Sequence, residues 1–176
     1  GTRNYYVDDS ESELTSYVGD WIEGVREGTG VGYYRNDDNV AFYRGQWHRG
    51  LRHGRGLFVN ETNGVSYDGE WRNDLVHGHG VYTGSDGSVF NGTFVDGLKE
   101  GHGEMTSKDG GMFIGNYAKG RREGLGSIKF ADGRVLIGTF VEGMLDGKAT
   151  VIDGRTECEN YYQRGQLIKQ RCSTPQ

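Results

Sequence analysis

The fold is decided by the stretch "YDGEWRNDLVHGHGVYTGSDG", which runs from Tyr67 to Gly87. An aromatic residue, a glycine and a second aromatic residue stand at alternate positions in Tyr67, Gly69 and Trp71. Alternate residues of a β-strand point to the same face, so both rings and this glycine share one face. The closing Asp86-Gly87 supplies the positive φ that a tight hairpin turn requires. The stretch therefore predicts two short antiparallel strands.

The same pattern returns along the chain with a nearly constant period of 22 to 26 residues. The seven first positions are Tyr17, Tyr43, Tyr67, Phe90, Phe113, Leu136 and Cys158. Five of the units carry Asn-Gly or Asp-Gly, beginning at Asn63, Asp86, Asp109, Asp132 and Asp153. Self-similarity at a fixed period indicates an array of small stacked units. We therefore predict a series of β-hairpins.

Recurring glycines accompany the rings in both strands of each unit. Glycine inside a strand weakens it unless close packing needs the space, and its missing Cβ lets an aromatic ring lie flat on the backbone. We expect Gly54, Gly56 and Phe58 to share the ring face by simple alternation. The opposite face carries side chains such as Arg44 and Gln46 and is predicted to be solvated.

Composition excludes several classes of protein. The 176 residues include 32 glycines, with 34% apolar and 12% aromatic residues. Aliphatic side chains are too few for an ordinary core, while the rings are too many for a disordered chain. The net charge of −5 opposes nucleic-acid binding, because phosphates require an excess of Lys and Arg. No apolar run approaches the roughly 18 residues that span a membrane, so the chain is predicted to be soluble.

A unit with Tyr67, Gly69, Trp71, His77-Gly78, Gly80, Tyr82 and Asp86-Gly87 resembles the MORN repeat, the membrane occupation and recognition nexus motif. The resemblance covers residues 17–165, with a degenerate last unit at Cys158. It implies an all-β fold, an elongated and twisted single-layer antiparallel sheet of six to seven consecutive hairpins. About 14 strands at roughly 4.8 Å would make this sheet on the order of 65 Å long.

The ends of the chain are expected to differ from the array. Residues 1–16 are predicted to be a half-repeat or an N-terminal cap, and residues 166–176 a C-terminal tail or cap. Terminal repeats are often atypical because one side of them faces water. We also expect the chain to be cut from a longer protein.

Reactive sites are not favoured by the pattern. His79 and His102 are equivalent residues of successive hairpins, hence about 9.5 Å apart, and His77 shares a face only with His79. One zinc ion needs all its ligands at about 2 Å. The stretch "GMLDGKAT", residues 143–150, lacks the spacing of a phosphate-binding loop. We therefore predict no catalytic residue, no metal site and no cofactor.

Two cysteines, Cys158 and Cys172, are too few for a disulfide framework. They favour a reducing compartment, and we predict a cytoplasmic protein. Cys158 replaces a ring and is expected to be a small buried residue rather than a nucleophile.

The first candidate binding surface is the ring face. A single-layer sheet has no second layer to cover it, so the rings are expected to lie partly open in a groove. An amphipathic helix or an extended peptide of a protein partner would insert there, unless the rings satisfy only each other. The predicted partner-binding residues are Tyr17, Trp21, Tyr43, Trp47, Phe58, Tyr67, Trp71, Tyr82, Phe90, Phe94, Phe113 and Tyr117.

The second candidate surface is basic. Residues 43–56 contain no acid and four arginines, which are Arg44, Arg49, Arg52 and Arg55. Such a cluster suits a phosphate, an anionic lipid head group or an acidic stretch of a partner. The alternative is a solvated edge paired with Asp68 and Glu70. Terminal strands with unpaired backbone groups also invite a second copy, so a homodimer is a further expectation.

These features favour a non-catalytic scaffold that binds a protein partner at the membrane periphery or the cytoskeleton. The alternative is a module that binds phosphoinositides or anionic membranes. MORN-like repeats also accompany lipid kinase and lysine methyltransferase domains, so an accessory region of such an enzyme is a third interpretation. No residue here resembles those catalytic parts.

Overall fold

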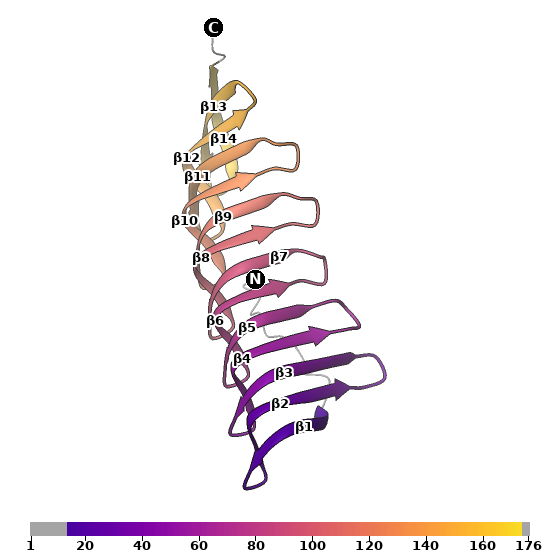
Figure 1. Ribbon diagram of the computed structural model, residues 1–176. Coiled ribbons are helices and arrows are strands. Elements are labelled where there is room, and N and C mark those ends of the chain that lie inside the picture. Colours follow the sequence, from indigo (N-terminus) through magenta and orange to yellow (C-terminus); the bar gives the residue numbers. More distant parts are fainter. Residues whose placement is uncertain (1–13, 174–176) are drawn as a thin grey trace. The chain divides into compact units, whose positions relative to one another are not determined.

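The computed structural model describes residues 14–173, which form strands joined by turns and contain no helix. Their order is β1 (Leu14–Ile22), β2 (Val25–Arg35), β3 (Val40–His48), β4 (Leu51–Asn60), β5 (Ser66–Arg72), β6 (Leu75–Thr83), β7 (Val89–Val95), β8 (Leu98–Thr106), β9 (Met112–Ala118), β10 (Arg121–Lys129), β11 (Val135–Val141), β12 (Met144–Asp153), β13 (Thr156–Gln163) and β14 (Gln166–Ser173). The sheet follows chain order without a crossover (Figure 1). The predicted all-β antiparallel sheet of consecutive hairpins is confirmed.

Two compact units divide the described residues. The first unit spans residues 14–98 with β1 to β7, and the second spans residues 99–173 with β8 to β14. Residues 166–173, predicted as a tail or cap, form β14 and pair with β13. The half-repeat or cap predicted for residues 1–16 lies outside the described residues, except for residues 14–16 at the start of β1.

Each hairpin turns through two residues with positive φ. Arg49 and Gly50, between β3 and β4, have φ of 51° and 82°. Asn73 and Asp74 differ from the other turns, because Asp74 adopts a φ of 66° where the other six hairpins of the described residues have glycine. From β4 onward, the predicted Asn-Gly and Asp-Gly turns lie between successive hairpins, and Gly87 in one of them has a φ of 82°, whereas residues 36–39 between β2 and β3 contain no glycine.

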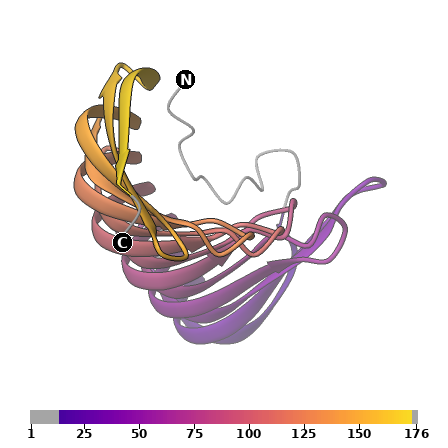
Figure 2. The same ribbon diagram turned by 90° about the horizontal axis from the view of Figure 1, so that it is seen from above.

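A β-bulge interrupts the hairpins β3–β4, β5–β6 and β9–β10 between the two glycines of the second strand. In β3 and β4, Gly45 pairs with Gly56, but Gln46 next to it pairs with His53. The expectation that Gly54 alternates regularly with Gly56 is therefore wrong, because Gly54 lies in the bulge with a φ of 60°. Bulges bend a strand locally, and Figure 2 shows strongly curved strands.

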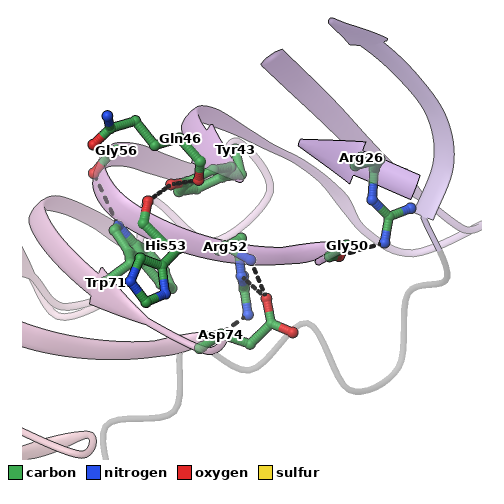
Figure 3. A network of polar contacts seen from close by, with 9 residues as sticks. All are labelled: Arg26, Tyr43, Gln46, Gly50, Arg52, His53, Gly56, Trp71 and Asp74. Carbon is green, nitrogen blue, oxygen red and sulfur yellow. Dashed lines mark hydrogen bonds and ion pairs between the residues drawn. The ribbon is translucent and has the colours of Figure 1, made fainter. Parts of the chain in front are cut away.

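The rings pack on the glycine backbone as predicted. A Cβ added to Gly56 would lie 2.3–2.4 Å from atoms of the Tyr43 side chain. This ring belongs to β3, so it covers Gly45 of its own strand as well as Gly56 of the neighbouring strand. Its hydroxyl donates to the carbonyl oxygens of Gln46 at 2.9 Å and His53 at 3.3 Å (Figure 3). One tyrosine thus bridges both strands at the bulge.

Candidate interaction surfaces

The ring face is largely closed. Tyr43 packs edge to face against Trp47 and Trp71, with both pairs of ring centroids 5.2 Å apart. The buried members of the predicted set are Tyr43, Trp47, Phe58, Tyr67, Trp71, Phe90, Phe94, Phe113 and Tyr117. This differs from the expectation of a partly open groove, because the rings cover one another. Partner contact through this face stays a prediction.

Three members of the predicted set are more accessible. Tyr17 and Tyr82 are partly exposed, and Trp21 is 54% exposed. Trp47, the equivalent of Trp21, packs against Tyr17 of the preceding unit and donates from Nε1 to the Gly30 carbonyl. Trp21 lies on β1, the first strand that the structure describes, which explains its greater exposure.

Basic side chains cover the buried rings, a feature that was not predicted from the sequence. The guanidinium carbon of Arg52 lies 4.6 Å from the centroid of Trp71, and that of Arg122 lies 4.4 Å from Phe113. Cations at such distances are attracted to the negative face of an aromatic ring. The signal was a basic residue at the second position of β2, β4, β8 and β10.

Arg52 is therefore not part of an accessible basic cluster. It is 4% exposed and forms an ion pair with Asp74, with Nε 3.0 Å from Oδ1 (Figure 3). Its backbone N–H donates to the same oxygen at 2.8 Å, and Nη2 donates to the Asp74 carbonyl at 3.1 Å. The prediction that Arg52 binds an external anion is wrong, because its side chain faces the rings and its charge is already paired.

The other three predicted arginines are exposed but lie in different places. Arg49 lies in the turn between β3 and β4, whereas Arg44 of β3 and Arg55 of β4 line the face opposite the rings. Within the described residues, none of these three arginines forms an ion pair with Asp68 or Glu70. Arg55 is nevertheless exposed and lies directly opposite Glu70 of β5, so the alternative of a solvated edge beside these acids stays a prediction.

Several carboxylates hold neighbouring hairpin turns. Glu27 of β2 accepts a hydrogen bond from the backbone N–H of Arg49 at 2.8 Å, and its other oxygen lies 2.7 Å from Nδ1 of His48. These bonds, first from Arg49 and then from His48, hold the pKa of Glu27 below its ordinary value. The same bond to a turn N–H joins Glu100 to Lys119, Glu123 to Glu142 and Asp146 to Arg164. These acids have a structural role.

A groove of about 520 Å³ lies on the face opposite the rings, over β1 to β4. Its side chains include Val18, Val31, Arg44 and Arg55, and its floor contains backbone at glycines such as Gly45. The groove combines apolar and positively charged groups. Such a groove is shaped to receive another molecule.

The cysteines differ from the expectation of free thiols. Cys158 of β13 and Cys172 of β14 face each other across the last hairpin and form a disulfide. Disulfides persist in oxidising compartments, so the cysteines do not support the predicted reducing compartment. Between residues 14 and 173, no group of three or more His, Cys, Asp or Glu residues is placed to hold a metal ion.

Membrane insertion through a helix finds no support in residues 14–173, where no helix is long and apolar enough to span a bilayer.

Comparison with known families gives five matches to the MORN repeat, at residues 17–38, 43–65, 67–89, 90–112 and 113–133. These matches cover more than half of the chain and coincide with the units read from the sequence. A comparison with curated proteins gives no match.

Proposed function

The chain belongs to the MORN repeat family, and from this premise we propose that it is a non-catalytic scaffold that binds a protein partner. MORN repeats are generally modules that interact with proteins or membranes. The family is typically non-catalytic, and the carboxylates described above serve hairpin turns. We place the partner on the sheet face opposite the rings, at the membrane periphery or the cytoskeleton.

The observation that carries this proposal is the difference between the two faces. The rings on the ring face are mostly buried against one another, whereas large apolar side chains on the opposite face are exposed to water. Val18 is 68% exposed and Tyr33 is 45% exposed in the first unit, and Leu125 is 67% exposed in the second. Within each unit, exposed apolar side chains on one face of the sheet are typical of a surface that contacts another protein.

The experiment compares proteins retained from an extract of the source cells by the immobilised wild type and by variants. Tyr33→Asp and Leu125→Asp, tested singly, place a charge on the proposed face. Ser85→Asp places the same charge in an exposed turn and serves as the control. We expect a partner that the wild type and Ser85→Asp retain and that at least one face variant loses.

The membrane alternative has its own readout in the same experiment. Vesicles containing phosphatidylserine are sedimented with each protein at low and high salt. Sedimentation that is lost in high salt, together with no protein retained by the wild type, would replace the proposed scaffold by an anionic-membrane module, since exposed charges are screened within about 10 Å at 0.1 M salt. Retention of the same protein by all variants would move the partner to another surface.

A further inference from the structure

We propose that the groove over β1 to β4 binds an extended acidic segment of a partner protein. In this complex, two carboxylates of the segment meet Arg44 and Arg55, and a neighbouring apolar side chain packs against Val18. This inference rests on the proposed function above and names the chemistry of the partner.

The spacing of the two arginines suits an extended chain. Arg44 of β3 lies directly opposite Leu57 of β4, and Arg55 precedes Leu57 by two residues on the same face. Such diagonal neighbours are about 7–8 Å apart in a regular sheet, and Arg55 stands at the bulge next to this regular pairing. Residues i and i+2 of an extended peptide are separated by about 6.7 Å and point to the same side. Acidic residues at i and i+2 therefore reach both guanidinium groups.

The groove carries more positive than negative charge, because Arg44 and Arg55 line it with one acid, Asp20, while Glu70 lies opposite Arg55 on β5. Within the described residues, neither Arg44 nor Arg55 forms an ion pair, and the guanidinium carbon of Arg44 lies 5.9 Å from the centroid of the Phe42 ring. Contact with a ring orients an arginine without neutralising it. Both groups are exposed and keep donors for an incoming carboxylate.

The acceptors in the groove are already used. The Asp20 carboxylate accepts hydrogen bonds from the backbone N–H of Thr29 at 2.9 Å and from its hydroxyl at 3.0 Å. These two bonds, the backbone one first, hold the pKa of Asp20 below its ordinary value. The amide oxygen of Gln46 accepts the backbone N–H of Arg55 at 2.7 Å. The groove thus has donors to spare, and an anion complements it.

The floor of the groove admits a peptide backbone together with an apolar side chain. Gly19, Gly30 and Gly45 pair in a row across β1 to β3 and form the floor, and any side chain at these positions would point to the ring face, away from the groove. Val18 and Val31 form the apolar end of the groove. A segment that places an apolar residue near its two acids fills both parts.

A flat anionic membrane fits this geometry less well. Of the four clustered arginines, Arg52 is buried on the ring face and Arg49 lies in a hairpin turn. Only two arginines therefore share the groove. Membrane attraction grows with the number of cations that reach the surface together, at about 1 kcal/mol each.

Fluorescence anisotropy with the folded chain tests this assignment. The probe is a labelled peptide with two aspartates separated by one residue and a leucine two residues further on, and its control carries asparagines in place of the aspartates. Arg44→Glu with Arg55→Glu is compared with Arg35→Glu and Arg155→Glu, which reverse two exposed charges elsewhere. Circular dichroism checks that both double variants are folded.

We expect the aspartate peptide to bind the wild type and the control variant at least about tenfold more tightly than the groove variant. Equal binding of the asparagine peptide, or no loss in the groove variant, would overturn the inference. Vesicle binding that depends on the same arginines, without peptide binding, would also overturn it. If the groove variant still retains the partner captured from cell extract, the scaffold function stands and the assignment of this groove fails.

Discussion

Two hairpins of the first unit and one hairpin of the second have the same architecture with different chemistry at the centre. In the first unit, Tyr43 and Tyr67 lie on glycine backbone, and each hydroxyl donates to two carbonyl oxygens at the bulge. In the second unit, Phe113 takes the same place without a hydroxyl and has Arg122 over its face. The ring and the glycine are therefore the common requirement, and the hydroxyl is an addition.

The comparison is sharpest at the glycine beneath each ring. A Cβ on Gly56 would lie 2.3 Å from the Tyr43 side chain, and one on Gly126 would lie 2.6 Å from that of Phe113. The contacting atoms belong to ring systems that are themselves packed on both sides. Neither ring can easily move aside, so both units require a residue without a Cβ at this position.

Gly56→Ala is expected to have the largest effect, a loss of about 3 kcal/mol in the free energy of unfolding, because overpacking a buried ring forces backbone shifts. Gly126→Ala is expected to cost about 2 kcal/mol, since its clash is less severe. Urea unfolding followed by circular dichroism measures both. Gly111→Ala is the control, because the nearest atom to its added Cβ is 3.3 Å away. Equal stability of Gly56→Ala and Gly111→Ala would contradict this account of the glycines.

The hairpin array and the ring face were predictable because both depend on local spacing. Alternation fixes which residues share a face, and Asp-Gly fixes the turns, so the unit from Tyr67 to Gly87 was sufficient to predict the fold. The face on which Gly54 lies was predicted incorrectly, because a bulge shifts the register there. In the sequence, the residues of this bulge do not differ from ordinary strand residues.

The candidate surfaces were harder to predict than the fold. Residues adjacent in sequence point to opposite faces, so the four arginines within residues 43–56 separate in the structure. Arg52 follows the hairpin turn, and its side chain therefore faces the rings. Its charge is neutralised by Asp74 of the next hairpin, a contact between units that the sequence does not show. The burial of the rings likewise depends on packing between units, which no single unit contains.

Exchanging the two chemistries tests whether the hydroxyl is an addition. Tyr43→Phe leaves the carbonyl oxygens of Gln46 and His53 without this donor and is expected to cost about 1.5 kcal/mol of unfolding free energy. Phe113→Tyr places a hydroxyl at the equivalent bulge and is expected to stabilise by up to about 1 kcal/mol. The same urea experiment measures both. If Phe113→Tyr destabilises as much as Tyr43→Phe, the two units differ in more than this hydroxyl.

The smallest expected effect is a loss of stability in alkali that belongs to the first unit. Burial raises the pKa of Tyr43 and of Tyr67 above the ordinary value of 10.0. The unfolded chain then loses these protons at a lower pH than the folded chain, so their contribution is complete below pH 10 and declines as pH rises above it. At pH 10 the loss is about 0.4 kcal/mol for each tyrosine.

The measurement is the free energy of unfolding at about pH 8 and about pH 10 for the wild type and for Tyr43→Phe with Tyr67→Phe. The double variant removes both groups, so its stability should change less over this interval than that of the wild type. Tyr33→Phe is the matched control, because the Tyr33 ring is 45% exposed on the opposite face. An identical alkaline loss in the double variant would show that these hydroxyls titrate alike in the folded and unfolded chains. Burial would then not protect them, and the proposed distinction between the units would lose its electrostatic part.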